Sequence, residues 1–193
     1  MKKVGLTGGI GSGKTIVSQI FSLLNIPIFN SDKEAKLLMI APPLKNKIID
    51  LLGYEAYTTK GELNKQYIGQ LIFSNSTILS KINTLVHPEV EKSFCKFVQK
   101  NSNADYIIKE AAILFESGSY KKLDAIVLVY SDKETRIQRV IDRDTLTRND
   151  ILKKINTQMS DKKKIELSDY IIKNNNELII PQIIKIHKTL LKQ

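Results

Sequence analysis

A short glycine-rich run near the N-terminus constrains the fold of this chain more than any other feature. Residues 8–15 read Gly-Gly-Ile-Gly-Ser-Gly-Lys-Thr, which matches the pattern G-x-x-x-x-G-K-[ST]. An apolar run with Val4 and Leu6 precedes it, and a stretch with apolar residues at helical spacing follows it. The order predicts a buried strand, a tight turn and an amphipathic helix, which is the arrangement of a phosphate-binding loop.

Each residue type in this run has a physical role in holding a polyphosphate. Glycines leave space in which backbone N–H groups converge, and a helix that begins near Gly13 adds unpaired N–H groups and the positive end of its dipole. We expect Lys14 to reach the β and γ phosphates, the Thr15 hydroxyl to hold Mg²⁺, and Ile16 to contribute its backbone N–H. The candidate nucleotide-binding residues are Gly8, Gly9, Gly11, Ser12, Gly13, Lys14, Thr15 and Ile16.

Apolar, strand-like runs alternate with longer helical stretches along the chain. The predicted strands are residues 4–7, 26–29, 106–109, 125–130 and 170–172. This alternation predicts an α/β fold with a five-stranded, mainly parallel sheet flanked by helices, as in P-loop NTPases of the nucleoside monophosphate kinase type.

Two insertions interrupt the predicted core, and we expect one domain with subdomains. Residues 34–100 contain no convincing strand and suggest several short helices, so we expect a helical acceptor-binding subdomain there. Residues 139–160 are polar and charged, and residues 147–150 have the form of a helix-capping box, so we expect a lid. The core then comprises residues 1–33, 101–138 and 161–193.

The composition is that of a folded, basic chain. Its 193 residues carry a formal net charge of +10, and 42% of them are hydrophobic, which is enough for a sizeable core. The basic residues are scattered, and the densest run, residues 162–164, is typical of a solvated helix face. An acidic small molecule explains the charge as well as nucleic acid would, and we expect no nucleic-acid partner.

The single cysteine and the lack of long apolar runs bear on location. Cys95 excludes an intramolecular disulfide and fits a reducing compartment, and we expect it to be a small, buried or half-buried apolar residue. No apolar run reaches the length of a membrane span, and the N-terminus passes directly into the first predicted strand. We expect a cytoplasmic protein without a membrane partner, either a monomer or a weak homo-oligomer.

Two acidic residues follow predicted strands at the edge where open α/β sheets bind ligands. Asp32 follows the second strand and is our candidate for accepting a proton from an attacking hydroxyl; its alternative role is to cap a helix that begins at Lys33. Glu110 follows the third strand. It is a candidate substrate-site residue that could hold Mg²⁺ through water, or it is a salt-bridged strand end.

A longer stretch around the loop points to a particular family. Residues 5–15, Gly-Leu-Thr-Gly-Gly-Ile-Gly-Ser-Gly-Lys-Thr, closely resemble the opening of dephospho-CoA kinases, which is typically introduced by Leu-Thr-Gly-Gly-Ile. Further segments resemble that family's motifs in order and spacing: residues 28–32 (its Asp-x-Asp strand end), His87-Pro88, residues 113–116 (its Leu-Leu-Phe-Glu), residues 136–143, Thr147-Arg148, Gln158 and residues 169–174. The resemblance spans nearly the whole chain.

The resemblance implies transfer of the ATP γ-phosphoryl group to the ribose 3'-hydroxyl of dephospho-coenzyme A, with Mg²⁺ as the metal. It implies that Asp32 is the catalytic base or hydroxyl-orienting group, and Lys14 is the other catalytic residue of the core. The lid and lid-flanking cations that it implies are Arg139, as a catalytic residue, and Arg143 and Arg148, as nucleotide-binding residues. Their alternative role is that of arginines on an exposed amphipathic helix.

Other positions match the family pattern less directly or depart from it. His87 is interpreted as structural or acceptor-lining, because Pro88 suggests that one helix ends there and another begins. Asn174, after the last predicted strand, is expected near the adenine. Asn30 replaces the first aspartate of the family's Asp-x-Asp, and Ala112 replaces the proline before Leu-Leu-Phe-Glu, which puts a metal or proton role for position 30 in doubt.

Two other classes of protein share part of this pattern. A different small-molecule kinase, for a nucleoside monophosphate or for shikimate, has the same loop and a lid, and only a test of acceptors separates it from the first hypothesis. A regulatory GTPase ordinarily has a guanine-reading Asn-Lys-x-Asp. Residues 64–67, Asn-Lys-Gln-Tyr, lack its final aspartate.

Overall fold

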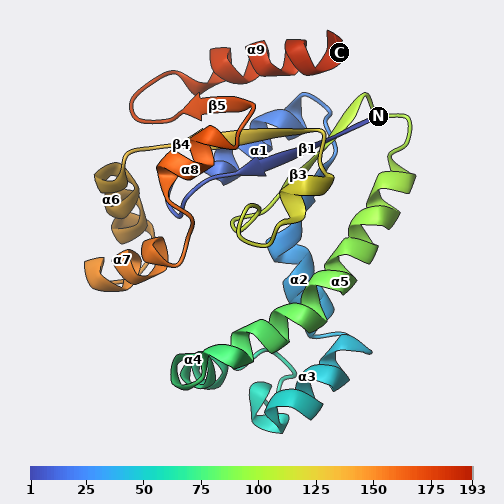
Figure 1. The fold of residues 1–193 in the computed structure, drawn as a ribbon, viewed down its shortest axis with the longest axis vertical. Helices are drawn as coiled ribbons and strands as arrows, with labels where there is room; N and C mark the ends of the chain where they lie inside the picture. The colour runs from blue at the N-terminus through green and yellow to red at the C-terminus, as the bar shows by residue number, and fades with distance from the viewer. Residues whose placement is uncertain (193) are drawn as a thin grey trace. The chain divides into compact units, whose positions relative to one another are not determined.

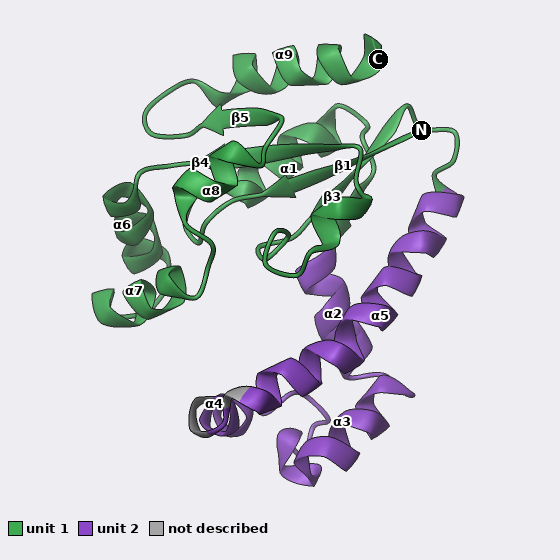
Figure 2. Cartoon of the chain, in the orientation of Figure 1, with its two compact units in different colours: residues 1–30, 101–193 green, residues 31–100 purple. Residues whose placement is uncertain are grey.

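The computed structural model describes residues 1–192, apart from the side chains of residues 73, 74 and 76. The chain forms two compact units, coloured separately in Figure 2. One unit comprises Met1–Asn30 and Asn101–Gln193, and it contains the sheet. The other comprises Ser31–Lys100 and is made of helices.

The first unit is built on a parallel sheet of five strands (Figure 1). The strands are β1 (Lys2–Thr7), β2 (Ile28–Asn30), β3 (Tyr106–Glu110), β4 (Ala125–Tyr130) and β5 (Tyr170–Lys173). Their order is β2-β3-β1-β4-β5, and every neighbouring pair runs parallel. The five predicted strands are confirmed, with ends displaced by no more than two residues. β1 is the central strand, so the turn that follows it lies in the middle of the sheet's carboxyl edge.

Helices cover the sheet because alternate residues of each strand point to opposite faces. On one face, Val4, Leu6 and Val127 pack with α1 (Lys14–Leu23) and α9 (Ile179–Lys192), through residues such as Phe21 and Ile183. On the other face, Ile126 packs with Ala111, Leu114 and Phe115, and α8 (Asp161–Glu166) contacts β4. η2 (Ser119–Lys122) precedes β4. Both faces are therefore buried, as expected of a parallel sheet.

Two helices follow β4 and share a small core of their own. These are α6 (Lys133–Arg143) and α7 (Arg148–Asn156), which meet through Ile137, Val140 and Ile151. Thr147 caps α7 by accepting a hydrogen bond from the Asp150 N–H, so the predicted helix cap is confirmed. The side chain of Ile10 packs against this cluster, which ties the glycine-rich loop to these helices.

The second unit is organised around one long helix. Its elements are α2 (Ser31–Met39), α3 (Leu44–Leu52), η1 (Tyr54–Ala56), α4 (Lys65–Ser74) and α5 (Ser76–Lys100), and α2, α3 and α4 each pack against α5. The prediction that Pro88 divides two helices is wrong, because α5 runs through it. Buried residues at every fourth position, Ile82, Val86, Val90 and Phe94, form one stripe on both sides of the proline. Packing of this stripe outweighs the hydrogen bond that proline removes.

Two further expectations are corrected. Cys95 is exposed rather than buried, because its position on α5 lies outside the buried stripe of that helix. Residues 162–164 are not all solvated: Lys164 is only 1% exposed, and its Nζ lies 3.4 Å from Glu116 Oε1. A short helix packed on the sheet must bury one of three successive lysines, and a carboxylate compensates that charge.

Candidate active site

The glycine-rich loop leaves β1 and turns into α1 through two residues with positive φ. Gly11 has φ of 78°, and Gly13, the N-cap of α1, has φ of 95°. The Ser12 N–H donates to the Gly9 carbonyl, and the N–H groups of Ile16 and Val17 donate to the Gly13 carbonyl at 3.1 and 3.3 Å. Because only glycine adopts these backbone angles without strain, Gly11 and Gly13 allow the chain to turn sharply and to begin α1 directly after the turn.

Neighbouring groups lie so close to the loop glycines that no side chain would fit at these positions. A Cβ atom at Gly8 would overlap the Val129 carbonyl, one at Gly9 the Arg136 guanidinium, and one at Gly13 the Asn174 amide. The glycines therefore do more than permit the turn. They let β4, α6 and the segment after β5 approach its backbone.

Polar groups of the loop are arranged for an anion. In the part of the chain that the structure describes, the buried hydroxyl of Ser12 has no hydrogen-bond partner, and the same is true of Thr7 at the end of β1. Lys14 Nζ donates to the carbonyls of Gly8 and Gly9, at 2.8 and 3.4 Å. An unsatisfied donor and an ammonium at a helix N-terminus fit a phosphate group, which supplies the acceptors that the protein does not.

The donor set also fits Mg²⁺ held mainly by phosphate. Thr15, at the start of α1, is exposed, so its hydroxyl is accessible to a metal. Among residues 1–192, no group of three or more His, Cys, Asp or Glu side chains is placed to hold a metal ion. Mg²⁺ commonly takes one or two protein ligands together with phosphate oxygens and water, so this donor set suffices.

A hydrogen bond joins the carboxyl ends of β2 and β3. Asn30 and Glu110 are register partners, and Asn30 Nδ2 donates to Glu110 Oε2 at 3.0 Å. Glu110 is buried, with 6% of its surface exposed. The neutral amide at position 30 therefore satisfies a buried carboxylate, which an aspartate at that position would repel.

The remaining acceptor-side candidates lie in the helical unit. Asp32 is exposed in the first turn of α2, two residues after the end of β2. The alternative that it caps a helix starting at Lys33 is wrong, because α2 begins at Ser31. His87 is exposed near the middle of α5. Their roles stay predictions.

The three predicted cations of the lid region each have a partner. Arg139 Nη1 donates to Ser131 Oγ at 3.3 Å, and Arg148 Nη2 donates to both carboxylate oxygens of Glu134. Arg143 donates two hydrogen bonds to Asp144. The same pair lowers the pKa of the Asp144 carboxyl and raises that of Arg143, so both groups are ionised at neutral pH. Arg143 and Arg148 are exposed, and their partners are acidic residues that phosphates can replace.

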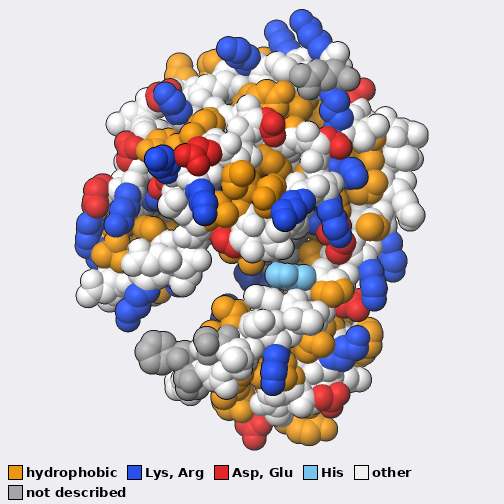
Figure 3. All heavy atoms as spheres, viewed as in Figure 1, with side chains coloured by type: hydrophobic (Ala, Val, Ile, Leu, Met, Phe, Trp, Pro, Cys, Tyr) orange, Lys and Arg blue, Asp and Glu red, His pale blue; other side chains and the backbone are white. Residues whose placement is uncertain are grey.

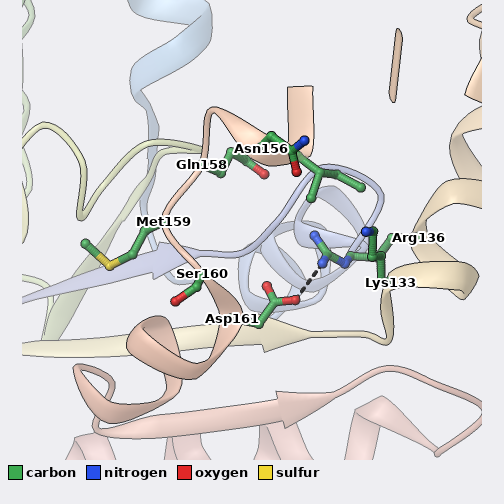
Figure 4. Close-up of a pocket in the computed structure, with 8 residues that line it drawn as sticks. Lys133, Arg136, Asn156, Gln158, Met159, Ser160 and Asp161 are labelled. Carbon is green, nitrogen blue, oxygen red and sulfur yellow. Dashed lines mark hydrogen bonds and ion pairs between the residues drawn. The ribbon is translucent and has the colours of Figure 1, made fainter. Parts of the chain in front are cut away.

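Three side chains from outside residues 8–15 contact the phosphate loop, and none of them was predicted from the sequence to do so. Asn174 Nδ2 donates to the Ser12 carbonyl at 2.8 Å, and its place near the adenine stays a prediction. Gln158 Oε1 accepts the Ile10 N–H at 3.1 Å. Arg136 is 2% exposed and pairs with Asp161 at 2.6 Å. Figure 4 shows Arg136 and Asp161 facing each other in a pocket of about 370 Å³.

Comparison with known proteins decides which family this loop and sheet belong to. The family model for dephospho-CoA kinase matches residues 2–179. The chain belongs to the dephospho-CoA kinase family. It is 37% identical over 186 residues to a dephospho-CoA kinase of Bacteroides fragilis, covering 95% of this chain and 90% of that protein. It is 36% identical over 202 residues to one of Chlorobium chlorochromatii, covering 98% and 94%.

Solved structures share the fold of this family member. The protein TT1252 of Thermus thermophilus matches with a TM-score of 0.85 and 25% identity, covering 99% of this chain and 96% of that one. A dephospho-CoA kinase of Campylobacter jejuni matches with a TM-score of 0.72 and 22% identity, covering 98% and 97%. A shikimate kinase of Acinetobacter baumannii matches with a TM-score of 0.53 and 17% identity, covering 100% and 94%, which shows a shared fold.

Two surface properties complete the description of this family member. Figure 3 shows Lys and Arg side chains distributed over the visible face among acidic and uncharged ones, as the scattered basic residues of the sequence predicted. Within residues 1–192, every helix is too short or too polar to cross a lipid bilayer.

Proposed function

We propose that this protein is a dephospho-CoA kinase, which transfers the γ-phosphoryl group of ATP to the ribose 3'-hydroxyl of dephospho-coenzyme A. The products are coenzyme A and ADP, and the reaction is the last step of coenzyme A biosynthesis. The observation that carries the proposal is the loop of residues 8–15, with its crowded glycines, the unsatisfied Ser12 hydroxyl and the Lys14 ammonium, in a chain of this family.

The loop holds the triphosphate of ATP. Backbone N–H groups at the start of α1 donate to the phosphate oxygens, the Ser12 hydroxyl donates to one of them, and Lys14 exchanges its carbonyl partners for the β and γ phosphates. The Thr15 hydroxyl would hold Mg²⁺, which would supply charge neutralisation for the phosphates.

The acceptor side activates and places the sugar hydroxyl. Asp32 takes the proton of the 3'-hydroxyl as its oxygen forms a bond to the γ phosphorus, while the bond from that phosphorus to the β-γ bridging oxygen breaks and ADP leaves. Glu110, which accepts a hydrogen bond from Asn30, lies at the carboxyl edge of the sheet. His87 lines the binding site of the acceptor.

The cations of residues 139–160 stabilise the transferring group. Phosphoryl transfer has a loose transition state in which charge spreads over the equatorial oxygens, so cations brought close to it lower the barrier. Arg143 and Arg148 exchange their exposed carboxylate partners for phosphate oxygens when the lid closes, and Arg139 approaches from α6.

One experiment tests this function directly. Purified protein is incubated with Mg²⁺-ATP and dephospho-coenzyme A, and the products are analysed by mass spectrometry. In parallel reactions, shikimate or AMP replaces dephospho-coenzyme A, or GTP replaces ATP. We expect coenzyme A and ADP in the first reaction and no phosphorylated shikimate or AMP. Efficient phosphorylation of shikimate or AMP, with dephospho-coenzyme A unchanged, would contradict the proposal. A cytoplasmic location, a monomer or weak homo-oligomer, and the absence of nucleic-acid partners stay predictions.

A further inference from the structure

We propose that residues 158–161, which we call the loop brace, position the phosphate loop and thereby set the affinity for ATP. The proposal rests on the proposed function. It assigns Gln158 and Asp161 as positioning residues that touch no substrate and act through the backbone of residues 9–11.

The first contact of the loop brace is with the backbone of Ile10. The Ile10 N–H donates to Gln158 Oε1 at 3.1 Å, so this amide is satisfied by a side chain 148 residues away in sequence. The Ile10 side chain packs against Ile137, Val140 and Ile151. The outer turn of the loop is therefore fixed by one hydrogen bond and by apolar packing, and its other amides keep their direction towards the ligand.

The second contact runs through Arg136. Its Nη2 donates to Asp161 Oδ2 at 2.6 Å, and its side chain is 3% exposed, whereas that of Asp161 is 36% exposed. The guanidinium lies where a Cβ atom of Gly9 would be, and the Arg136 carbonyl lies where one of Gly11 would be. Arg136 thus packs directly against the backbone of Gly9 and Gly11, and its ion pair with Asp161 fixes the position of the guanidinium. Among the described residues, Arg136 Nε has no hydrogen-bond partner, so the ion pair made by Nη2 is the main polar constraint on this side chain.

The loop brace is itself attached to the body of the unit. The Met159 N–H donates to Glu116 Oε1 at 2.7 Å, and Lys164 Nζ lies 3.4 Å from the same oxygen. The Ser160 hydroxyl accepts the Lys163 N–H and caps α8, which contacts β4. A segment fixed at residues 159–160 can therefore hold the loop through the side chains on either side, Gln158 and Asp161. Figure 4 shows that these residues lie on one segment, with Asp161 directed at Arg136.

This arrangement makes a specific kinetic prediction. Loss of either contact lets residues 9–11 move, which weakens phosphate binding, while the acceptor site does not depend on these bonds. The Michaelis constant for ATP should rise, and that for dephospho-coenzyme A should not. A role in stability alone would lower the amount of active enzyme and leave both Michaelis constants of the folded molecules at their wild-type values.

The test uses three substitutions and one control in the full-length protein. Gln158→Leu removes the acceptor for Ile10, Asp161→Ala removes the partner of Arg136, and Asp161→Asn keeps an oxygen acceptor without the charge. Glu166→Gln, at an exposed position on the same helix as Asp161, is the control for loss of one carboxylate charge. Steady-state kinetics with each substrate varied, ATP binding by calorimetry and thermal unfolding are measured for all.

We expect Gln158→Leu and Asp161→Ala to raise the Michaelis constant and the dissociation constant for ATP roughly tenfold, and Asp161→Asn to lie between Asp161→Ala and wild type. The value for dephospho-coenzyme A should stay within about twofold, and Glu166→Gln should match wild type. Unchanged ATP affinity in Asp161→Ala and Gln158→Leu, or an equal loss for both substrates, would overturn the loop brace. A wild-type protein that binds ATP but makes no coenzyme A would instead overturn the proposed function, and calorimetry would still test the brace.

Discussion

At the scale of single residues, the cations of the candidate site are bound to partners that a phosphate group could replace. Lys14 donates to carbonyls of its own loop, and Arg143 and Arg148 donate to exposed acidic residues. On the proposed function, a charge-assisted bond to phosphate would replace each of these contacts. ATP would then meet cations that are already directed by the protein.

Asp32 is the residue whose substitution tests the chemistry most directly. We expect Asp32→Asn to lower kcat by roughly 100- to 10,000-fold, because an amide accepts no proton from the attacking hydroxyl, while ATP affinity stays nearly intact. The measurement is steady-state kinetics together with ATP binding. Asp50→Asn, at another exposed aspartate of the helical unit, is the matched control and should behave as wild type. Wild-type turnover in Asp32→Asn would remove Asp32 from the mechanism.

Single residues also show where sequence reasoning ends. The loop residues were predictable because glycine, lysine and threonine occur there at a fixed spacing with a mechanical reason for each. Arg136 was not, since an arginine in an amphipathic helix reads as exposed. It is buried only because Gly9 and Gly11 leave room for it and Asp161, 25 residues further on, compensates its charge. Pairings of this kind are properties of the fold and leave no periodic signal in the sequence.

At the scale of elements, local signals predicted strands well and one long helix poorly. The strands are apolar runs bounded by turn residues, and their ends differ from prediction by no more than two residues. α5 was divided because Pro88 is a strong local signal for a helix end. The buried residues on either side of Pro88 keep the same face, and this tertiary packing decided the outcome.

The cap of α7 gives a prediction for the lid region. Thr147 Oγ1 accepts the Asp150 N–H and donates to Asp150 Oδ2, which lowers the pKa of that carboxyl. We expect Thr147→Ala to destabilise α7 by about 1 kcal/mol, seen as faster amide hydrogen exchange in residues 148–156, while Thr147→Ser retains protection.

The pH dependence of this cap follows from the sign of the shift. Because the folded pKa of Asp150 is depressed, its contribution is present above the ordinary carboxyl pKa and is lost as pH falls through the lower folded value. The exchange difference between Thr147→Ala and wild type should therefore shrink in acid. A difference that grows in acid, or equal exchange in the alanine and serine variants at neutral pH, would contradict the cap.

At the scale of the whole molecule, the order of the strands brings the functional positions of the first unit to one edge. β1 is central, and the loop that follows it lies between the carboxyl ends of β3 and β4. Alternation of strands and helices was enough to predict this parallel sheet. The structure begins the helical unit at Ser31, whereas the sequence placed that subdomain at residues 34–100. The functional roles of the helical unit and of residues 139–160 stay predictions.

Binding of nucleotide to the folded state should raise its thermal stability. At a Mg²⁺-ATP concentration about 100 times the dissociation constant, linkage adds about 2.7 kcal/mol, or roughly 5–10 °C in Tm for a chain of this size. Lys14→Ala should largely lose this shift, because the ammonium that contacts the phosphates is absent. Lys188→Ala, on exposed α9 surface, is the control and should keep it. An equal Tm for wild type with and without Mg²⁺-ATP would count against the loop as the nucleotide site.

The contacts behind the phosphate loop also determine when it becomes functional as the chain is made. Residues 8–15 are synthesised well before the residues whose side chains contact them, which are at positions 136, 158 and 174. On the proposed function, a nascent chain would therefore carry the complete motif before it has the contacts that position the loop for ATP. Stabilisation of the fold by ATP would then begin only after β5 is made, and we expect chains terminated before it to bind nucleotide poorly although residues 8–15 are intact.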